Sequence, residues 1–249
     1  NASNTAYRSV GGALFDRGQT TLIAYPAGNA ATSYALPAGV TSIGDYAFAA
    51  CRSLASVTIP NSVASIGQSA FYGCSGLAGV TIPGSVTNLG DSAFHNCAGL
   101  ASVTIAGGVT NLGDSAFYFC PSLISVYFEG NAPALGAYSY VFFGDEAATI
   151  YYLPGTTGWA GFAANTGLAP VLWNPQVQTT GGGFGVRTNQ FGFTASGTAG
   201  LVVVVEASTS LAKPAWQPLG TNTLNGGSFH FSDPQWTNYP ARFYRLRMP

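Results

Sequence analysis

The sequence has very few charged residues. Only 7% of its 249 residues are Asp, Glu, Lys or Arg, whereas soluble domains usually have about 25%. Because the chain is 47% apolar, its surface has to be made largely of Ser, Thr, Asn, Gln and Gly. Such a surface favours an extracellular protein that carries glycans, packs in an assembly, or does both.

Positive charge is missing from the middle of the chain. No Lys or Arg occurs between Arg52 and Arg187, while five carboxylates fall in that interval. Residues 1–173 contain three arginines against seven carboxylates, and the remaining residues carry a basic excess. Because the longer part is mildly acidic and the tail only mildly basic, we expect no nucleic acid partner.

Residue types that usually carry catalysis or bind metals are scarce. The only histidines, His95 and His230, are far apart, and no His-x-x-x-His, Cys-x-x-Cys, Gly-x-Ser-x-Gly or phosphate-loop motif occurs. The carboxylates are too few and too scattered to form an evident acid/base pair. We therefore expect a protein that is not an enzyme, with no cofactor and no metal site. A run of about 18 apolar residues is also missing, which argues against a membrane span.

The chain does contain an exact 23-residue repeat. The segment from Cys51 to Gly73 recurs at residues 74–96 and 97–119 without an insertion. An exact period in this range indicates a solenoid. The repeated columns are Leu54/Leu77/Leu100/Leu123, Val57/Val80/Val103/Val126, Ile59/Ile82/Ile105/Phe128, Phe71/Phe94/Phe117 and Cys51/Cys74/Cys97/Cys120.

Each repeat predicts a coil that begins with a short strand. Within residues 54–59 the apolar side chains point inward, while Ser56 and Thr58 point outward, because strand side chains alternate between faces. Pro60 then ends the strand, since proline cannot donate to a ladder. No single coil can bury its own apolar face, so the coils must stack with their strands in a parallel ladder.

The return path of each coil carries a glycine and usually an aspartate. Gly67 marks a place where a side chain would obstruct the turn. Asp45, Asp91 and Asp114 follow the equivalent glycines. At this position an aspartate is expected to cap the first turn of a short helical or 3₁₀ segment.

The cysteines occur only in the repeat column, one in each coil. Their place beside a buried Phe predicts small packing residues with free thiols. A disulfide down the stack is the alternative, because adjacent coils lie close enough for one.

The pattern Leu-x-x-Val-x-Ile-Pro-x-x-Val-x-x-Ile-Gly-x-x-Ala-Phe-x-x-Cys resembles the BspA-like leucine-rich repeat family of bacterial and protozoan proteins. The resemblance is specific over residues 32–128 and looser to about residue 155. It implies a secreted or surface-attached protein with a non-enzymatic role in adhesion or binding, and it brings no catalytic residues. Ala106 and Gly107 depart from the Pro-Asn pair of the repeat.

The predicted fold is mainly β, with a capped leucine-rich-repeat solenoid at residues 1–173. Its N-terminal cap covers about residues 1–29 and includes a hairpin, its coils cover about residues 30–128, and its C-terminal cap covers about residues 129–173. After Cys120 the period slips. The recurrence of apolar residues at Ala148, Tyr151 and Leu153 predicts one distorted coil and a final strand.

The remaining residues follow a different pattern. Residues 174–183 are rich in glycine and are predicted to be a linker. Residues 184–249 contain short strand-like runs broken by Gly, Asn and Pro. These runs predict a small antiparallel β-sandwich.

Three groups of residues are candidate binding surfaces. Tyr72, His95 and Tyr118 follow the buried Phe of successive coils and should stack along one edge, where they receive sugar rings or pack between coils. A flat strand face carries Thr58, Thr81 and Thr104. This face is either simply solvated, or it carries glycans, contacts another subunit or binds ice. Aromatic residues that either cap the open core or form a ligand-contacting patch include Tyr138, Tyr140 and Trp159.

These features predict a non-catalytic protein that is secreted or bound to a bacterial cell surface. Its partner would be a protein or a glycan, in adhesion or binding. The alternative is a structural subunit of an extracellular filament or surface layer, in which copies of the chain assemble head to tail. Residues 1–10 are then a candidate strand that adds to the sheet edge of a neighbour.

Overall fold

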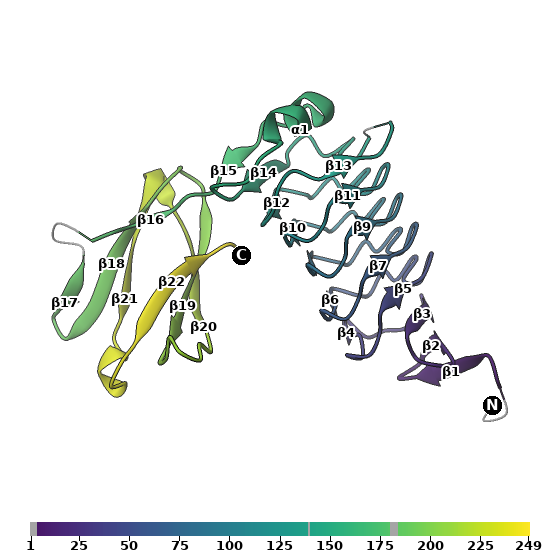
Figure 1. The fold of residues 1–249 in the computed structure, drawn as a ribbon, viewed down its shortest axis with the longest axis horizontal. Helices are drawn as coiled ribbons and strands as arrows, with labels where there is room; N and C mark the ends of the chain where they lie inside the picture. The colour runs from purple at the N-terminus through teal and green to yellow at the C-terminus, as the bar shows by residue number, and fades with distance from the viewer. Residues whose placement is uncertain (1–3, 139, 180–183) are drawn as a thin grey trace. The chain divides into compact units, whose positions relative to one another are not determined.

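The computed structural model describes residues 4–138, 140–179 and 184–249. The chain forms two compact units, residues 1–171 and residues 172–249 (Figure 1). Both units consist mainly of β-strands, and the described residues include one α-helix, α1 (Trp159–Thr166). Each unit is described by itself.

Stacked coils build the first unit, and two ladders of strands run along it (Figure 1). The longer strands pair in parallel with a step of 23 residues, so that Ser102 lies opposite both Gly79 and Ser125. The predicted solenoid with parallel strands is therefore confirmed. In order, this ladder contains β4 (Ser33–Ala35), β6 (Ser56–Thr58), β8 (Gly79–Ile82), β10 (Ser102–Ile105), β12 (Ser125–Phe128), β14 (Thr149–Tyr152) and β15 (Val171–Leu172).

The second ladder lies on the return path of the coils and contains mainly two-residue strands. The sequence predicted no strand on this return path. The N-terminal cap begins this ladder with two antiparallel pairings, and β3 then pairs in parallel with β5 of the first coil. In order, the ladder contains β1 (Tyr7–Val10), β2 (Ala13–Asp16), β3 (Thr21–Ala24), β5 (Ser42–Ile43), β7 (Ser65–Ile66), β9 (Asn88–Leu89), β11 (Asn111–Leu112) and β13 (Ala134–Leu135).

The N-terminal cap contains the predicted hairpin. Strands β2 and β3 flank the turn, and Asp16 Oδ1 accepts the backbone N–H groups of Thr20 and Thr21 at 2.7 Å each. Within the predicted arm, residues 7–10 form the exposed edge strand β1, while residues 1–3 lie outside the described part of the chain.

A column of parallel phenylalanine rings forms the centre of the stack. Neighbouring ring centroids lie 4.7–5.4 Å apart, and the ring planes differ by no more than 8°. This spacing follows the distance of about 4.8 Å between paired strands. The column contains Phe48, Phe71, Phe94, Phe117 and Phe142, all of them buried.

The aspartates of the return path bind the next coil, so the prediction of helical capping was wrong. Asp45 Oδ1 accepts the N–H of Gln68 at 2.8 Å, and Asp91 Oδ1 accepts the N–H of Asp114 at 2.9 Å. Each coil forms hydrogen-bonded turns here and no helix, and the carboxylate accepts from the backbone of the following coil. The glycine is required because a Cβ at Gly67 would lie 2.4 Å from Asp45 Oδ1.

The last coil is distorted, as predicted, but its register differs by one residue from the prediction. Val126 pairs with Ile150, which is fully buried, while Tyr151 is only half-buried. Compared with the 23-residue period, the chain has two extra residues between β13 and Phe142. It then has one residue fewer between Phe142 and β14. The assignment of Tyr151 to the inward column was therefore wrong. Helix α1 completes the cap with Phe162, whose ring packs edge-on against a core phenylalanine.

The second unit contains the predicted antiparallel sheets. Its buried residues Phe193, Ala195 and Val205 pack with partly buried aromatics. Strand β16 (Gln176–Gln178) lies inside the stretch predicted to be a linker, and it pairs with β18. Residues 180–183 of that stretch lie outside the described residues. One sheet contains β16, β17 (Gly185–Arg187), β18 (Gln190–Ser196) and β21 (Ser228–Asp233), and the other contains β19 (Val202–Ser208), β20 (Gln217–Thr223) and β22 (Phe243–Arg247).

Replacing a ring in the central column should destabilise the first unit strongly. We expect Phe94→Ala to lower the free energy of unfolding by about 3–5 kcal/mol, because it removes contacts to both neighbouring rings and leaves a cavity. Thr81→Ala, on the exposed strand face, should cost under about 1 kcal/mol. Denaturant titrations measure both variants, and equal losses would contradict the inward and outward assignment.

Candidate functional site

An aromatic row lies along the turn edge of the first unit. Tyr72, His95 and Tyr118 each follow a phenylalanine of the central column. The ring centroids of Tyr72 and His95 lie 5.1 Å apart, and those of His95 and Tyr118 lie 4.9 Å apart. Tyr72 is 41% exposed, and the other two rings are half-buried. The coil stack thus brings three residues from different repeats into one row.

Further aromatic side chains lengthen this row toward the C-terminal cap. Phe143 stacks on Tyr118 with centroids 5.2 Å apart, and Phe119 lies 5.1 Å from Tyr118. Tyr140 meets Phe143 edge-on at 6.0 Å. About half of the surface of each added side chain is exposed. We call the whole set the aromatic ladder, which contains Tyr72, His95, Tyr118, Phe119, Tyr140 and Phe143.

Sequence reasoning missed two members of the ladder, Phe119 and Phe143. Phe143 follows Phe142 as Tyr118 follows Phe117, so a step of 25 residues would have revealed it. Phe119 gave no such signal, because its repeat column shows no aromatic residue in the other coils.

The backbone of Phe119 adopts a left-handed conformation that most side chains avoid. Its φ is +57°, and the equivalent residues Ala50, Gly73, Asn96 and Gly144 also have positive φ. Glycine adopts this conformation freely and asparagine tolerates it, whereas other residues lose about 1–2 kcal/mol. Because Phe119 is 48% exposed, burial of its side chain offsets little of the free energy lost to this strain. Tyr46 is also exposed and has a φ of +56°, so Phe119 is distinguished not by its strain but by its ring contacts with Tyr118 and Phe143.

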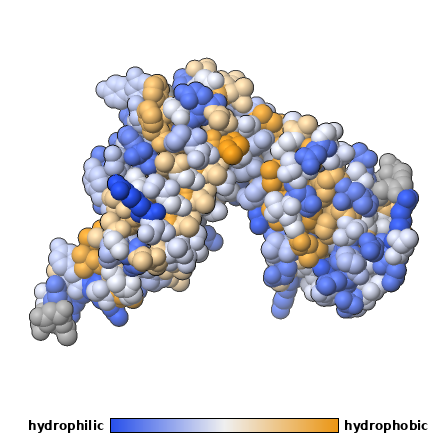
Figure 2. Space-filling view, turned by 180° about the vertical axis from the view of Figure 1, so that it is seen from behind, coloured by the Kyte–Doolittle hydropathy of each residue, from blue (hydrophilic) through white to orange (hydrophobic). Residues whose placement is uncertain are grey.

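The ladder has no formal charge at neutral pH. Burial lowers the pKa of His95 below its ordinary value, so its imidazole is neutral. Every charged residue between positions 53 and 186 is acidic. Figure 2 shows the surface of the first unit mainly in pale colours, with only scattered strongly hydrophilic side chains. Because neighbouring rings pack against one another, the ladder offers mainly ring edges, hydroxyl groups and an imidazole to a partner.

Two other predicted site residues lie apart from the ladder. Tyr138 is 74% exposed, but no ring contact within the described part of the chain joins it to the ladder. Trp159 is only 7% exposed, and its Nε1 donates a hydrogen bond to Thr156 Oγ1 at 2.9 Å. Its ring packs against Phe128 and Tyr152. Trp159 is thus a core residue of the cap and is unavailable to a surface partner.

The threonine face is shorter than the solenoid. Thr58 and Thr81 are exposed, and Thr104 is half-buried. In the next two coils this column continues with Tyr127 and Tyr151, whose rings stack with centroids 5.1 Å apart. A flat threonine surface therefore covers only three coils.

A buried carboxylate replaces the cysteine in the last coil. Asp145 is 2% exposed, and its Oδ1 accepts the N–H of Cys120 at 2.6 Å. Among the described residues, Asp145 Oδ2 has no hydrogen-bond partner. Burial raises the pKa of Asp145 to about 7. In the coils before it, the buried thiols donate to phenylalanine carbonyls, as Cys97 does to Phe71 at 3.0 Å.

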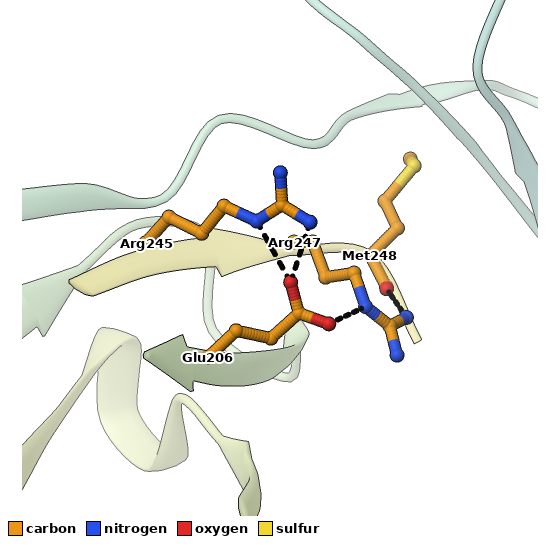
Figure 3. Close-up of polar contacts among 4 residues, drawn as sticks. All are labelled: Glu206, Arg245, Arg247 and Met248. Carbon is orange, nitrogen blue, oxygen red and sulfur yellow. Dashed lines mark hydrogen bonds and ion pairs between the residues drawn. The ribbon is translucent and has the colours of Figure 1, made fainter. Parts of the chain in front are cut away.

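An ion-pair cluster in the second unit is structural. Glu206 on β19 lies between Arg245 and Arg247 of the neighbouring strand β22 (Figure 3). Arg245 Nε donates to Glu206 Oε2 at 2.7 Å, and Arg247 Nε donates to Oε1 at 2.6 Å. Although burial opposes it, hydrogen bonding to Arg247 and Arg245 lowers the pKa of Glu206 below its ordinary value. Both carboxylate oxygens are thus occupied.

The described residues contain neither a metal-binding cluster nor a membrane-spanning helix. Within residues 4–138, 140–179 and 184–249, no group of three or more His, Cys, Asp or Glu side chains could hold a metal ion. No helix in those ranges is long and apolar enough to cross a membrane. The aromatic ladder is therefore the candidate site that the geometry supports best.

The repeats match a known family over residues 27–145. The matching model describes a BspA type leucine-rich repeat region, present here in six copies. This segment is a BspA-type leucine-rich repeat region. The aromatic ladder lies on these repeats. No match was found among curated proteins.

Solved structures share the fold of the BspA-type region. A leucine-rich repeat protein from Eubacterium ventriosum is 26% identical, with a TM-score of 0.55 over 60% of this chain and 40% of that one. A leucine-rich cell surface protein from Faecalibacterium prausnitzii is 28% identical, with a TM-score of 0.54 over 66% and 42% of the two chains. The pneumococcal vaccine antigen PcpA is 21% identical, with a TM-score of 0.53 over 69% and 48%. The match thus spans less than half the length of each of these proteins.

Neutralising Asp145 should remove a pH dependence from the first unit. Its folded pKa lies above its unfolded value, so its contribution to stability is present below about pH 4 and is lost as the pH rises through 7. We expect Asp145→Asn to gain in melting temperature over wild type as the pH rises from 4 to 8. Calorimetry across this range measures the difference. The exposed-site control Glu129→Gln should show none, and a flat difference for Asp145→Asn would contradict the prediction.

Removing the charge of Glu206 should destabilise the second unit. We expect Glu206→Gln to lower its free energy of unfolding by about 1.5–3 kcal/mol, because two charge-assisted hydrogen bonds are weakened. The folded pKa of Glu206 is depressed, so wild type should lose this contribution as the pH falls through that pKa. Chemical unfolding followed by tryptophan fluorescence measures the change. Arg187→Gln, at an exposed single charge, is the control, and equal effects would contradict a structural clamp.

Proposed function

We propose that this protein is a non-catalytic binding module that is secreted or displayed on a bacterial surface. The aromatic ladder holds an extracellular partner, as an adhesion protein does. The observation that carries this proposal is the continuous row of exposed and half-buried rings, which the coil stack lines up along one edge. The BspA-type repeats and their resemblance to a leucine-rich cell surface protein support the location.

Binding of the purified protein to immobilised extracellular polymers tests this function. The panel contains matrix proteins and polysaccharides, and bound protein is quantified at increasing concentration. We expect saturable binding to at least one polymer, and a loss of about tenfold or more in the combined variant Tyr72→Ala, His95→Ala and Tyr118→Ala, because it removes three ring contacts. Alanine is the natural residue at the equivalent position 49 of the first coil.

Tyr46→Ser is the matched control. Tyr46 is an exposed aromatic residue outside the ladder, and the other coils carry Ser69, Ser92 and Ser115 at its position. It should bind as wild type does. Binding that is unchanged in the combined variant would contradict the proposal.

The edge strand β1 favours a second candidate, a head-to-tail filament. Its four residues end the second ladder, and among the described residues β2 is its only strand neighbour, so a strand from another copy could pair with its outer edge. Sedimentation of the full chain separates the two functions. A species of 25.5 kDa at high concentration contradicts the filament, and polymers that disappear when residues 1–10 are deleted support it.

A further inference from the structure

We propose that the second unit binds an extended peptide in which apolar and acidic residues alternate. The peptide adds as a strand to the outer edge of β22, over a groove between the two sheets. This site belongs to the second unit, whereas the aromatic ladder belongs to the first, so the proposal goes beyond the binding function proposed above. An uncovered apolar strip, an open strand edge and an excess of positive charge carry it.

The inner face of one sheet is left partly uncovered at its margin. Val177 on β16 lies opposite Ala195, and Val186 on β17 lies opposite Phe191. Directly opposed residues of an antiparallel pair share one face of the sheet, and Ala195 is fully buried in the core. Val177 and Val186 therefore lie on the inner face, yet they are 37% and 53% exposed. Among the described residues, this strip of apolar surface has no strand over it.

A groove of about 240 Å³ opens beside this strip. One sheet lines it with Val177, Phe184 and Phe191, and β22 lines the other side with Phe243 and Tyr244. The rings of Phe191 and Tyr244 stack between the sheets with centroids 4.8 Å apart, and the half-exposed Phe184 meets Phe191 edge-on at 5.7 Å. Pockets for small molecules usually measure about 300–1,000 Å³. The groove therefore fits one or two side chains of a peptide better than a whole small molecule.

Strand β22 supplies hydrogen-bonding groups along the same groove. It is the last strand of its sheet, and among the described residues β19 is its only strand neighbour. The outer edge of such a strand presents N–H and C=O groups that can pair with a further strand. A peptide added there lies over β16 and β17, and every second side chain, about 6.6 Å apart, points into the groove. These positions of the peptide are the apolar ones.

The remaining side chains of the added strand meet positive charge. Tyr244 and Leu246 pack toward the core, so Arg245 and Arg247 project from the opposite face of β22. Both arginines bind the single carboxylate of Glu206 (Figure 3), which leaves one positive charge in excess. Their side chains are 45% and 44% exposed. Because opposite charges on neighbouring strands attract, the outward positions of the peptide are acidic.

The same charges argue against self-association through this edge. Pairing the β22 strands of two copies would bring Arg245 and Arg247 of one copy against those of the other. Pairing β22 with the edge strand β1 of another copy would add Arg8 to them. Like charges on neighbouring strands are destabilising, and charged side chains are a common guard against edge-to-edge pairing. The structure therefore favours an acidic strand from a different protein.

Fluorescence anisotropy of labelled nonapeptides, titrated with the full chain, tests the proposal. The acidic probe alternates Glu with Val and Phe. A basic probe has Lys in place of each Glu, a scrambled probe has the acidic composition without alternation, and a proline probe has Pro at its centre. We expect saturable binding of the acidic probe and binding about tenfold or more weaker for the other three. Lysine repels the arginines, scrambling misplaces the apolar side chains, and proline removes a backbone donor.

Hydrogen exchange followed by NMR locates the bound peptide. Binding of the acidic probe should slow the exchange of backbone amides in β22, because half of them gain a strand partner. The amides of β20, at the other end of the same sheet, should not change.

Two variants test the groove itself. Phe184→Ser should weaken binding of the acidic probe severalfold, and Val177→Thr, which keeps the shape of the side chain, should weaken it by a smaller factor. Melting temperatures close to that of wild type show that the fold is kept. Leu211→Ser is the control, because Leu211 is 59% exposed and does not line the groove, and it should bind as wild type does.

Several results would overturn the proposal. They are no binding of the acidic probe, equal binding of the scrambled or basic probe, protection of β20 in place of β22, and full affinity in Phe184→Ser. A dimer of the full chain that dissociates in Phe184→Ser would assign the groove to a second copy and would also overturn it.

Discussion

The whole first unit depends on the hydrogen bonding and ring stacking between one coil and the next. A coil of 23 residues cannot bury its own apolar face, so its neighbours supply the other half of the core. The turn beside the central column shows this directly, because Phe94 donates its N–H to Ala116 of the next coil at 2.7 Å while its ring stacks on Phe117. Backbone and side chains thus impose the same repeat distance on everything attached to them.

The candidate site is a consequence of that constraint. A residue that follows the buried phenylalanine recurs at the same distance as the phenylalanine itself, so Tyr72, His95 and Tyr118 form a row without any contact designed for the purpose. The C-terminal end of the ladder is different. Phe119 holds a conformation that favours glycine or asparagine, and stability alone does not explain it. Tyr46 shares this exposure and conformation, and what sets Phe119 apart is that its ring contacts Tyr118 and Phe143.

The repeat made most of the solenoid predictable from sequence. A strict period transfers every inward position from one coil to the next, which is why the buried column of Phe71, Phe94 and Phe117 and the parallel ladder of the regular coils were predicted. The prediction failed where a second coil supplies the partner, as at Asp45, since the donor Gln68 lies 23 residues away. It also failed at Tyr151, because an insertion and its compensation shift the strand register by one residue. The sequence pattern left Trp159 either as a cap of the open core or as part of a ligand-contacting patch, and its burial shows that it caps the core.

Coil stacking places the His95 ring between those of Tyr72 and Tyr118 at the surface of the first unit. Proton NMR titration of the imidazole tests this most directly, with His230→Gln used to assign the two histidines. We expect the pKa of His95 to lie below its ordinary value and its carbon-bound protons to show ring-current shifts. Both should move toward ordinary values in Tyr118→Ala. An ordinary pKa and unshifted resonances that do not respond to Tyr118→Ala would contradict it.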